Sequence, residues 1–172
     1  MNYDWLKEQK APRVLVQAVK QLGVTEIVGK EHNPVILSWA RELKLASVYN
    51  SDEIPWCGLF VAYCCKMAGL DVVDKPLWAL SWATWGNPVT EPMLGDILTF
   101  KRTGGGHVGI YVGEDLTHYH VLGGNQGNSV SVSRIAKSRL HKARRTAWKV
   151  AQPTSVRKIK LAPKGVITTN EA

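Results

Sequence analysis

The chain has 172 residues, of which 45% are hydrophobic and 21% charged, and its formal net charge is +8. This length suits one ordinary domain with a full core, and the composition excludes an intrinsically disordered chain. No apolar run approaches the ~20 residues of a membrane-spanning helix, so that class is excluded as well.

The basic residues are concentrated in the C-terminal part. From Arg134 onward there are eleven Lys or Arg residues and one acid, Glu171, which gives +10, whereas the first 133 residues carry −2. Such a region favours an anionic partner (a cell-wall polymer, a lipid surface or nucleic acid), although it can equally be a solvated tail that aids solubility. We divide the chain into one domain over 1–150 and a basic, partly flexible tail over 151–172.

The first third of the chain predicts helices. Apolar residues at helical spacing indicate a helix over 12–22, which Gly23 ends. A second helix starts at Asn33-Pro34, a capping residue followed by proline at the first helical position. A third runs from Trp56 to Met67.

The later part predicts strands. Residues 76–90, rich in Trp, Pro and Gly, are expected to form a loop with short helical pieces. Four segments then have the apolar or alternating pattern of strands, namely 97–100, 107–113, 119–122 and 129–135. Helices followed by strands are typical of an α+β domain, in which N-terminal helices pack on a C-terminal antiparallel β-sheet.

All three cysteines lie in the third predicted helix, within a span of nine residues, 57–65. Cys64 and Cys65 are adjacent and cannot readily pair, so a structural disulfide framework is rejected. Cys57 opens the helix, where free N–H groups and the helix dipole favour a thiolate and can hold an oxyanion. We therefore expect Cys57 to be a nucleophile and the other two to pack in the core.

A thiolate nucleophile needs a base within hydrogen-bond reach, and His107 is the best candidate. It follows three glycines and opens a predicted strand, where a tight bend leaves room beside a cleft. His118 and His120 are spaced to share one strand face, which suggests a metal site. The chain contains neither Cys-x-x-Cys nor His-Glu-x-x-His, so we predict no metal.

Asn125 lies in a Gly-Gly-Asn-Gln-Gly segment that ends the strand after His107. Its carbonyl oxygen can accept a hydrogen bond from one imidazole nitrogen and leave the other nitrogen for the thiol. The alternative is plain turn chemistry, since Asn beside Gly favours tight turns. Gln126 is a weaker candidate for the same orienting role.

Together these segments resemble the CHAP family of cysteine, histidine-dependent amidohydrolases and peptidases, which is related to the NlpC-type and papain-like cysteine peptidases. The motifs are IPWCGLFV at 54–61, PMLGDILTF at 92–100, GHVGIYVG at 106–113 and VLGGNQGN at 121–128. The match is closest to a compact phage-associated branch of the family and covers roughly residues 24–148.

This resemblance implies a papain-like fold with Cys57 as the nucleophile, His107 as the general base and Asn125 as the orienting residue. Trp56, beside the nucleophile, is expected either to pack the helix start or to line the cleft as a substrate-binding residue. Many relatives place an acid near the third position, and this chain has none there. Asp115 is a conceivable acid from elsewhere.

The resemblance further implies a monomeric, endolysin-like peptidoglycan hydrolase that cleaves an amide bond in the wall peptide or its link to the sugar. No cofactor and no nucleic acid is expected, and the basic tail would bind an anionic wall or outer-membrane surface. The N-terminus has no apolar signal core, so we expect synthesis in the host cytoplasm and action after release or export. Alternatives are an exported antibacterial amidase effector, another cysteine hydrolase, and a non-catalytic cell-wall-binding module.

Overall fold

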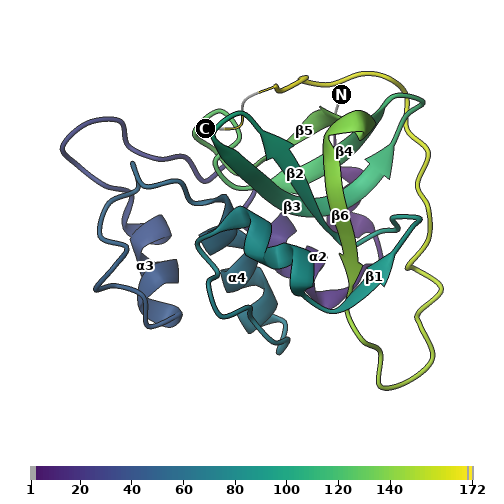
Figure 1. Cartoon of the computed structure of the whole chain (residues 1–172), viewed down its shortest axis with the longest axis horizontal. Helices are drawn as coiled ribbons and strands as arrows, with labels where there is room; N and C mark the ends of the chain where they lie inside the picture. The colour runs from purple at the N-terminus through teal and green to yellow at the C-terminus, as the bar shows by residue number, and fades with distance from the viewer. Residues whose placement is uncertain (1–2, 170, 172) are drawn as a thin grey trace.

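The computed structural model describes residues 3–169 and 171, with helices packed beside a single sheet (Figure 1). The helices are α1 (Trp5–Glu8), α2 (Arg13–Val19), α3 (Pro34–Glu42), α4 (Cys57–Met67) and the 3-10 helices η1 (Ala79–Thr84) and η2 (Lys137–Arg139). The strands are β1 (Asn87–Val89), β2 (Ile97–Arg102), β3 (Gly105–Glu114), β4 (His118–Gly123), β5 (Ser131–Ala136) and β6 (Leu140–Arg145). No helix of the described residues is long and apolar enough to cross a membrane.

The six strands form one sheet in the order β1-β6-β2-β3-β4-β5, and each neighbouring pair is antiparallel. The architecture is therefore α+β. The two strands absent from the sequence-based prediction are β1 and β6. The β6 sequence, LHKARR, has no clean apolar alternation, and it is held between β1 and β2 by backbone pairing.

The start of α3 and the end of α4 lie where local signals place them. The Asn33 side chain accepts a hydrogen bond of 2.8 Å from the Val35 N–H, with Pro34 at the first position of α3. The α4 helix begins at Cys57, and Gly69 follows its end with a φ of 72°. The α2 helix ends at Val19, earlier than the predicted 12–22, because the chain then turns toward the sheet.

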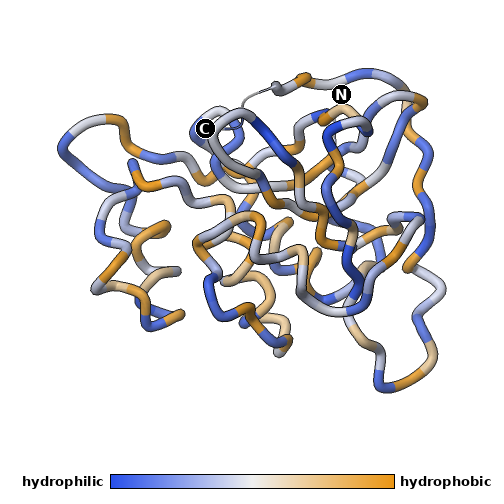
Figure 2. The backbone as a smooth tube through the Cα atoms, in the orientation of Figure 1, coloured by the Kyte–Doolittle hydropathy of each residue, from blue (hydrophilic) through white to orange (hydrophobic). Residues whose placement is uncertain are grey.

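The strands carry side chains into two hydrophobic clusters. The helix-side cluster contains the core faces of α2, α3 and α4 together with Val108, Ile110 and Val112 of β3. The far-side cluster contains Leu98, Phe100, Tyr111, Tyr119, Val121, Ile135 and Ala143. Alternate residues of β3 thus face opposite clusters, as the twofold repeat of a strand requires. Figure 2 shows hydrophobic residues gathered where the helices meet the sheet.

The basic C-terminal segment runs around the outside of the sheet (Figure 1) and pairs with it in two places. Lys160 forms a parallel bridge with Glu114, and Ile167 forms one with Arg134. The Arg134 N–H donates to the Val166 carbonyl at 2.7 Å. Backbone groups of Glu114, the last residue of β3, and of Arg134 on the edge strand β5 thus hold parts of the expected 151–172 tail against the sheet.

Candidate active site

Cys57 is the first residue of α4 and borders a pocket of 320 Å³. The pocket is lined by Pro55, Cys57, Leu77, Trp78, Ala79, Leu80 and Gly104, Gly105 and Gly106. A Cβ on Gly58 would lie 2.2 Å from the Pro76 carbonyl oxygen, so only glycine lets the Pro76 loop approach this first helical turn. Local sequence at the helix start therefore shapes the pocket beside the thiol.

The Cys57 sulfur is surrounded by backbone donors. The first N–H groups of a helix have no partner within it, and the N–H groups of Gly58 and of Val108 on β3 are directed at this sulfur. These donors favour the thiolate, but burial outweighs them and raises the pKa of Cys57 above its ordinary value. Cys57 is thus a thiol at neutral pH, because the N–H groups at the helix start lower its pKa by less than burial raises it.

Cys64 and Cys65 lie further along the same helix. Both are fully buried and unpaired, and burial raises the pKa of each thiol. They are therefore packing residues, as predicted, and leave Cys57 as the one cysteine that borders a pocket among those described.

His107 lies near the start of β3, buried between its neighbours. It pairs across strands with Phe100, whose ring stacks on the imidazole with centroids 6.5 Å apart. Its Nε2 lies 3.0 Å from Gln126 Oε1. A Cβ on Gly123 would lie 2.8 Å from Gln126 Oε1 and 3.2 Å from His107 Nε2, so glycine at this position leaves room for the contact.

The amide of Gln126 is held in one orientation. Its Nε2 donates to the carbonyls of Val121, at 3.2 Å, and Ser131, at 2.6 Å. Because carbonyl oxygens only accept, the amide nitrogen must face them and Oε1 must face His107. The neutral imidazole therefore carries its proton on Nε2, and its Nδ1 keeps a free lone pair.

Asn125 does not have the role predicted for it. Among the described residues, the imidazole donates its hydrogen bond to the Gln126 side chain, and the Asn125 side chain makes none with His107. Asn125 has a φ of 56°, a left-handed conformation that asparagine tolerates in turns. The turn at Asn125 thus places Gln126, the candidate that the sequence favoured less, beside the imidazole of His107.

Cys57 approaches β3 at Val108, the residue next to His107 in that strand. Val108, whose N–H is directed at the Cys57 sulfur, belongs to the helix-side cluster, whereas His107 pairs with Phe100 of the far-side cluster. No hydrogen bond between the thiol and the imidazole is present among the described residues. The structure brings the two groups to the same end of one strand without joining them.

Burial also sets the charge state of the base. It lowers the pKa of His107 to about 4, although the charge of Glu171 and the hydrogen bond with Gln126 act in the opposite direction. At neutral pH the site therefore holds a thiol and a neutral imidazole. A preformed thiolate–imidazolium pair is not its resting state.

Glu171 is an acid near the site that sequence reasoning missed. It is buried and accepts two hydrogen bonds from Arg139, at 2.7 and 2.9 Å. Arg139 also donates to the carbonyl of Lys101 on β2, the strand that pairs with the start of β3. The one sequence signal was that Glu171 is the single acid in a strongly basic segment.

Trp56 is not available as a substrate-binding residue. Its side chain is 0% exposed, and its indole N–H donates to Glu26 at 2.9 Å. A Cβ on Gly124 would lie 2.7 Å from the Trp56 ring, so the GGNQG segment packs directly against it. The substrate-binding prediction is wrong for a simple physical reason, since the ring is enclosed, and the packing alternative describes it.

The other acid considered from sequence, Asp115, belongs to a separate network. It binds Arg134 at 2.8 Å and His120 at 3.0 Å, and it caps the backbone at Thr117. His120 in turn meets the Tyr3 hydroxyl at 2.7 Å. Asp115 therefore ties the N-terminal segment to the sheet and makes no contact with His107.

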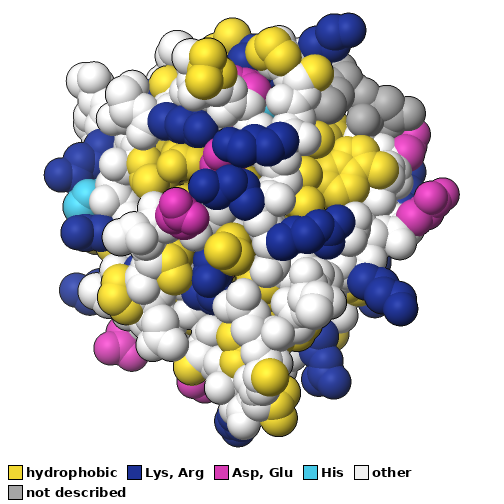
Figure 3. Space-filling view, turned by 90° about the vertical axis from the view of Figure 1, so that its right-hand side faces the viewer, with side chains coloured by type: hydrophobic (Ala, Val, Ile, Leu, Met, Phe, Trp, Pro, Cys, Tyr) yellow, Lys and Arg dark blue, Asp and Glu magenta, His cyan; other side chains and the backbone are white. Residues whose placement is uncertain are grey.

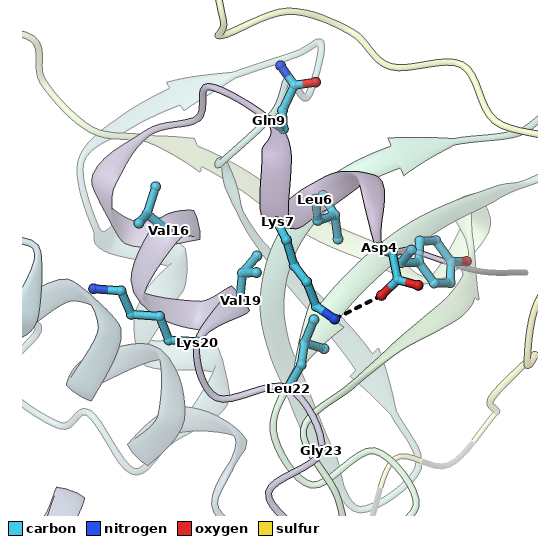
Figure 4. Close-up of a pocket in the computed structure, with 10 residues that line it drawn as sticks. Asp4, Leu6, Lys7, Gln9, Val16, Val19, Lys20, Leu22 and Gly23 are labelled. Carbon is cyan, nitrogen blue, oxygen red and sulfur yellow. Dashed lines mark hydrogen bonds and ion pairs between the residues drawn. The ribbon is translucent and has the colours of Figure 1, made fainter.

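No group of three His, Cys, Asp or Glu side chains within the described residues is arranged to hold a metal ion. A larger cavity, of 680 Å³, lies between α1 and α2, with Lys7 and Lys20 at its edge (Figure 4). Neither Cys57 nor His107 lines it. The candidate chemistry is therefore confined to the smaller pocket at the start of α4.

In comparisons with known proteins, no family model and no curated sequence matches this chain.

Proposed function

We propose that the protein is a cysteine hydrolase of the CHAP type that cleaves an amide bond of bacterial peptidoglycan, as a phage endolysin does. The observation that supports the proposal is that a pocket-lining Cys57 at a helix start approaches β3 at Val108, the residue next to a buried His107 in one fixed tautomer. A non-catalytic wall-binding module would not need the orientation that Gln126 imposes on His107. The substrate class rests on the sequence resemblance.

The chemistry follows from the groups at the site. The thiol and the imidazole are not hydrogen-bonded in the resting structure, so the reaction requires the two groups to come into contact when substrate binds. His107 Nδ1 then accepts the thiol proton, and the Cys57 sulfur attacks the amide carbonyl carbon. The N–H groups of Cys57 and Gly58 stabilise the resulting oxyanion. The imidazolium then gives its proton to the leaving amine, the C–N bond breaks, and a thioester remains on Cys57.

The second half of the reaction releases the acyl group. Neutral His107 takes a proton from water, and the hydroxide attacks the thioester carbonyl. Collapse of this intermediate breaks the C–S bond, and the proton returns to the sulfur. Products are a new amino group and a new carboxylate, which a mass analysis of digested sacculi distinguishes.

The test uses purified sacculi with the wild-type chain, Cys57→Ala and the matched control Cys64→Ala. We expect loss of turbidity and new amino groups with wild type and Cys64→Ala, and neither with folded Cys57→Ala. Full lysis by Cys57→Ala would overturn the mechanism.

The basic C-terminal segment supports the proposal of an anionic wall or outer-membrane partner. Figure 3 shows Lys and Arg side chains spread over the face that this segment helps to form. Lys149, Arg157 and Lys164 are exposed. We expect charge reversal at Lys149 and Lys164 to reduce pelleting with sacculi at low salt and to matter less at high salt. Unchanged pelleting at low salt would contradict this partner.

A further inference from the structure

Trp78 is the only exposed aromatic side chain among the described residues, and it lines the pocket that holds Cys57. It is 71% exposed, whereas Trp56, the tryptophan next to the cysteine in sequence, is enclosed. Aromatic rings are frequent in the lining of binding pockets. The position therefore points to a contact with substrate.

The segment 76–82, which carries Trp78, contacts both α4 and β3. The Trp82 indole N–H donates to the Pro76 carbonyl at 3.0 Å, and the same carbonyl touches the first turn of α4 at Gly58. On the other side, Leu80 packs on Gly106, one residue before His107. The indole is thus held at a set position beside the nucleophile.

The pocket lining restricts the chemistry of what can bind there. Apart from Cys57, its residues are apolar side chains or glycines, and none of them is charged. Stem peptides of peptidoglycan carry carboxylates and amines, which such a lining cannot neutralise. A pyranose ring is uncharged, has an apolar face of C–H groups that suits an indole, and has hydroxyls that can reach backbone groups at Gly104–Gly106.

The Lys75 ammonium lies over the Trp78 ring, 5.9 Å from its centroid, in a cation–π contact with one face of the indole, and Lys75 is not among the residues that line the pocket. We propose that Trp78 is the platform for an N-acetylated sugar, which places the amide between sugar and stem peptide at Cys57. This inference rests on the proposed function and makes the enzyme an amidase rather than an endopeptidase.

Binding can be measured apart from catalysis. Cys57→Ala protein is titrated with N-acetylmuramoyl dipeptide and, separately, with the same dipeptide lacking the sugar. The Trp78 indole signal, assigned in an NMR spectrum by its loss in Trp78→Phe, is followed in both titrations. We expect the sugar-bearing compound alone to shift it. Equal shifts with the bare dipeptide, or no shift with either compound, would overturn the proposal.

Activity gives the second readout. On sacculi, Trp78→Ala should lower kcat/KM about tenfold, mainly through KM, while Leu116→Ala, a distant and exposed control, should not. Circular dichroism of Trp78→Ala checks that the variant is folded, so that a higher KM reports a lost contact with substrate. Wild-type products lacking a new amino group on the first stem residue would overturn the sugar platform but leave the cysteine hydrolase. Absence of any wild-type cleavage would overturn the proposed function itself.

Discussion

His107 Nε2 and Gln126 Oε1 lie 3.0 Å apart, both on buried side chains, and the Gln126 amide is anchored at its other end by two backbone carbonyls. The carbonyls decide which end of the amide faces the imidazole, and the amide decides which imidazole nitrogen carries the proton. A glutamine thus orients the imidazole here, a task that an asparagine or a carboxylate performs in known hydrolases with a catalytic histidine.

Replacement of Gln126 tests this assignment. Gln126→Leu keeps the volume but removes the acceptor, so the proton is free to move to Nδ1 and the base loses its fixed tautomer. We expect the rate of amide hydrolysis per folded molecule to fall about 10²-fold, a typical effect of misorienting a general base. Hydrolysis of sacculi, normalised by the folded fraction from circular dichroism, measures it.

The matched control is Asn125→Gly, because glycine accepts the left-handed φ at that position without strain. This variant removes the neighbouring amide and should retain most of the activity. The reverse pattern, an inactive Asn125→Gly beside an active Gln126→Leu, would return the orienting role to Asn125.

The charge state of the site predicts the pH dependence of Cys57 reactivity. Burial raises the pKa of the thiol and lowers that of His107, so no ion pair supplies thiolate at neutral pH. Alkylation of the resting protein by iodoacetamide should therefore rise about tenfold per pH unit across the neutral range. A rate that is already high and constant from acid to neutral pH would show a preformed thiolate. Cys57→Ser serves as the blank for labelling elsewhere.

Glu171 offers a comparison between a buried and an exposed ion pair. The Glu171 side chain is 1% exposed and lies 2.7 Å from Arg139, whereas the Glu91 side chain is 67% exposed and lies 3.6 Å from Lys158. Glu171→Gln leaves Arg139 without its counter-charge and should lower the free energy of unfolding by about 2–3 kcal/mol. Glu91→Gln should change it by less than about 0.5 kcal/mol.

Urea unfolding of both variants measures these differences. A Glu171→Gln protein as stable as wild type would mean that the end of the chain contributes little to the domain. Glu171→Asp helps to separate charge from geometry, because it keeps the carboxylate but shortens its reach to Arg139. We expect an intermediate loss.

Local signals were sufficient for the main helices. Asn33-Pro34 begins α3 and Gly69 follows α4 because capping and helix termination depend on neighbouring residues alone. The β6 strand was missed because its residues are mostly polar and its stability comes from partners far away in sequence. Arg144 illustrates this, since its guanidinium binds the carbonyls of Trp85 and Gly86 near β1.

The sequence and the structure agree more on the types of residue at the candidate site than on their positions. Motif context singled out Cys57 and His107, and the structure brings both to the start of β3. The choice between Asn125 and Gln126 depends on the direction of one turn, which composition does not reveal. Proximity to Cys57 in the sequence suggested Trp56 for substrate contact, yet the Trp56 ring is enclosed, and the tryptophan that lines the pocket is Trp78.

The buried neutral imidazole also makes folding stability depend on pH. Its pKa is lowered to about 4 in the folded protein, below the ordinary value of 6.5, so between these values the unfolded chain binds more protons. Stability contributed by the neutral group is therefore full above the unfolded pKa and is lost as pH falls toward the folded pKa. The shift corresponds to a loss of about 2 kcal/mol between about pH 7.5 and pH 5.

His107→Gln isolates this contribution, because the other titrating groups are common to both proteins and cancel in the difference. The free energy of unfolding of the variant should fall less than that of wild type between the two pH values, by about 2 kcal/mol. Its stability at the higher pH is expected to be lower, since glutamine does not refill the space under Phe100. Parallel pH profiles for the two proteins would mean that His107 is protonated as easily in the folded chain as in the unfolded one, and the neutral resting state of the base would have to be abandoned.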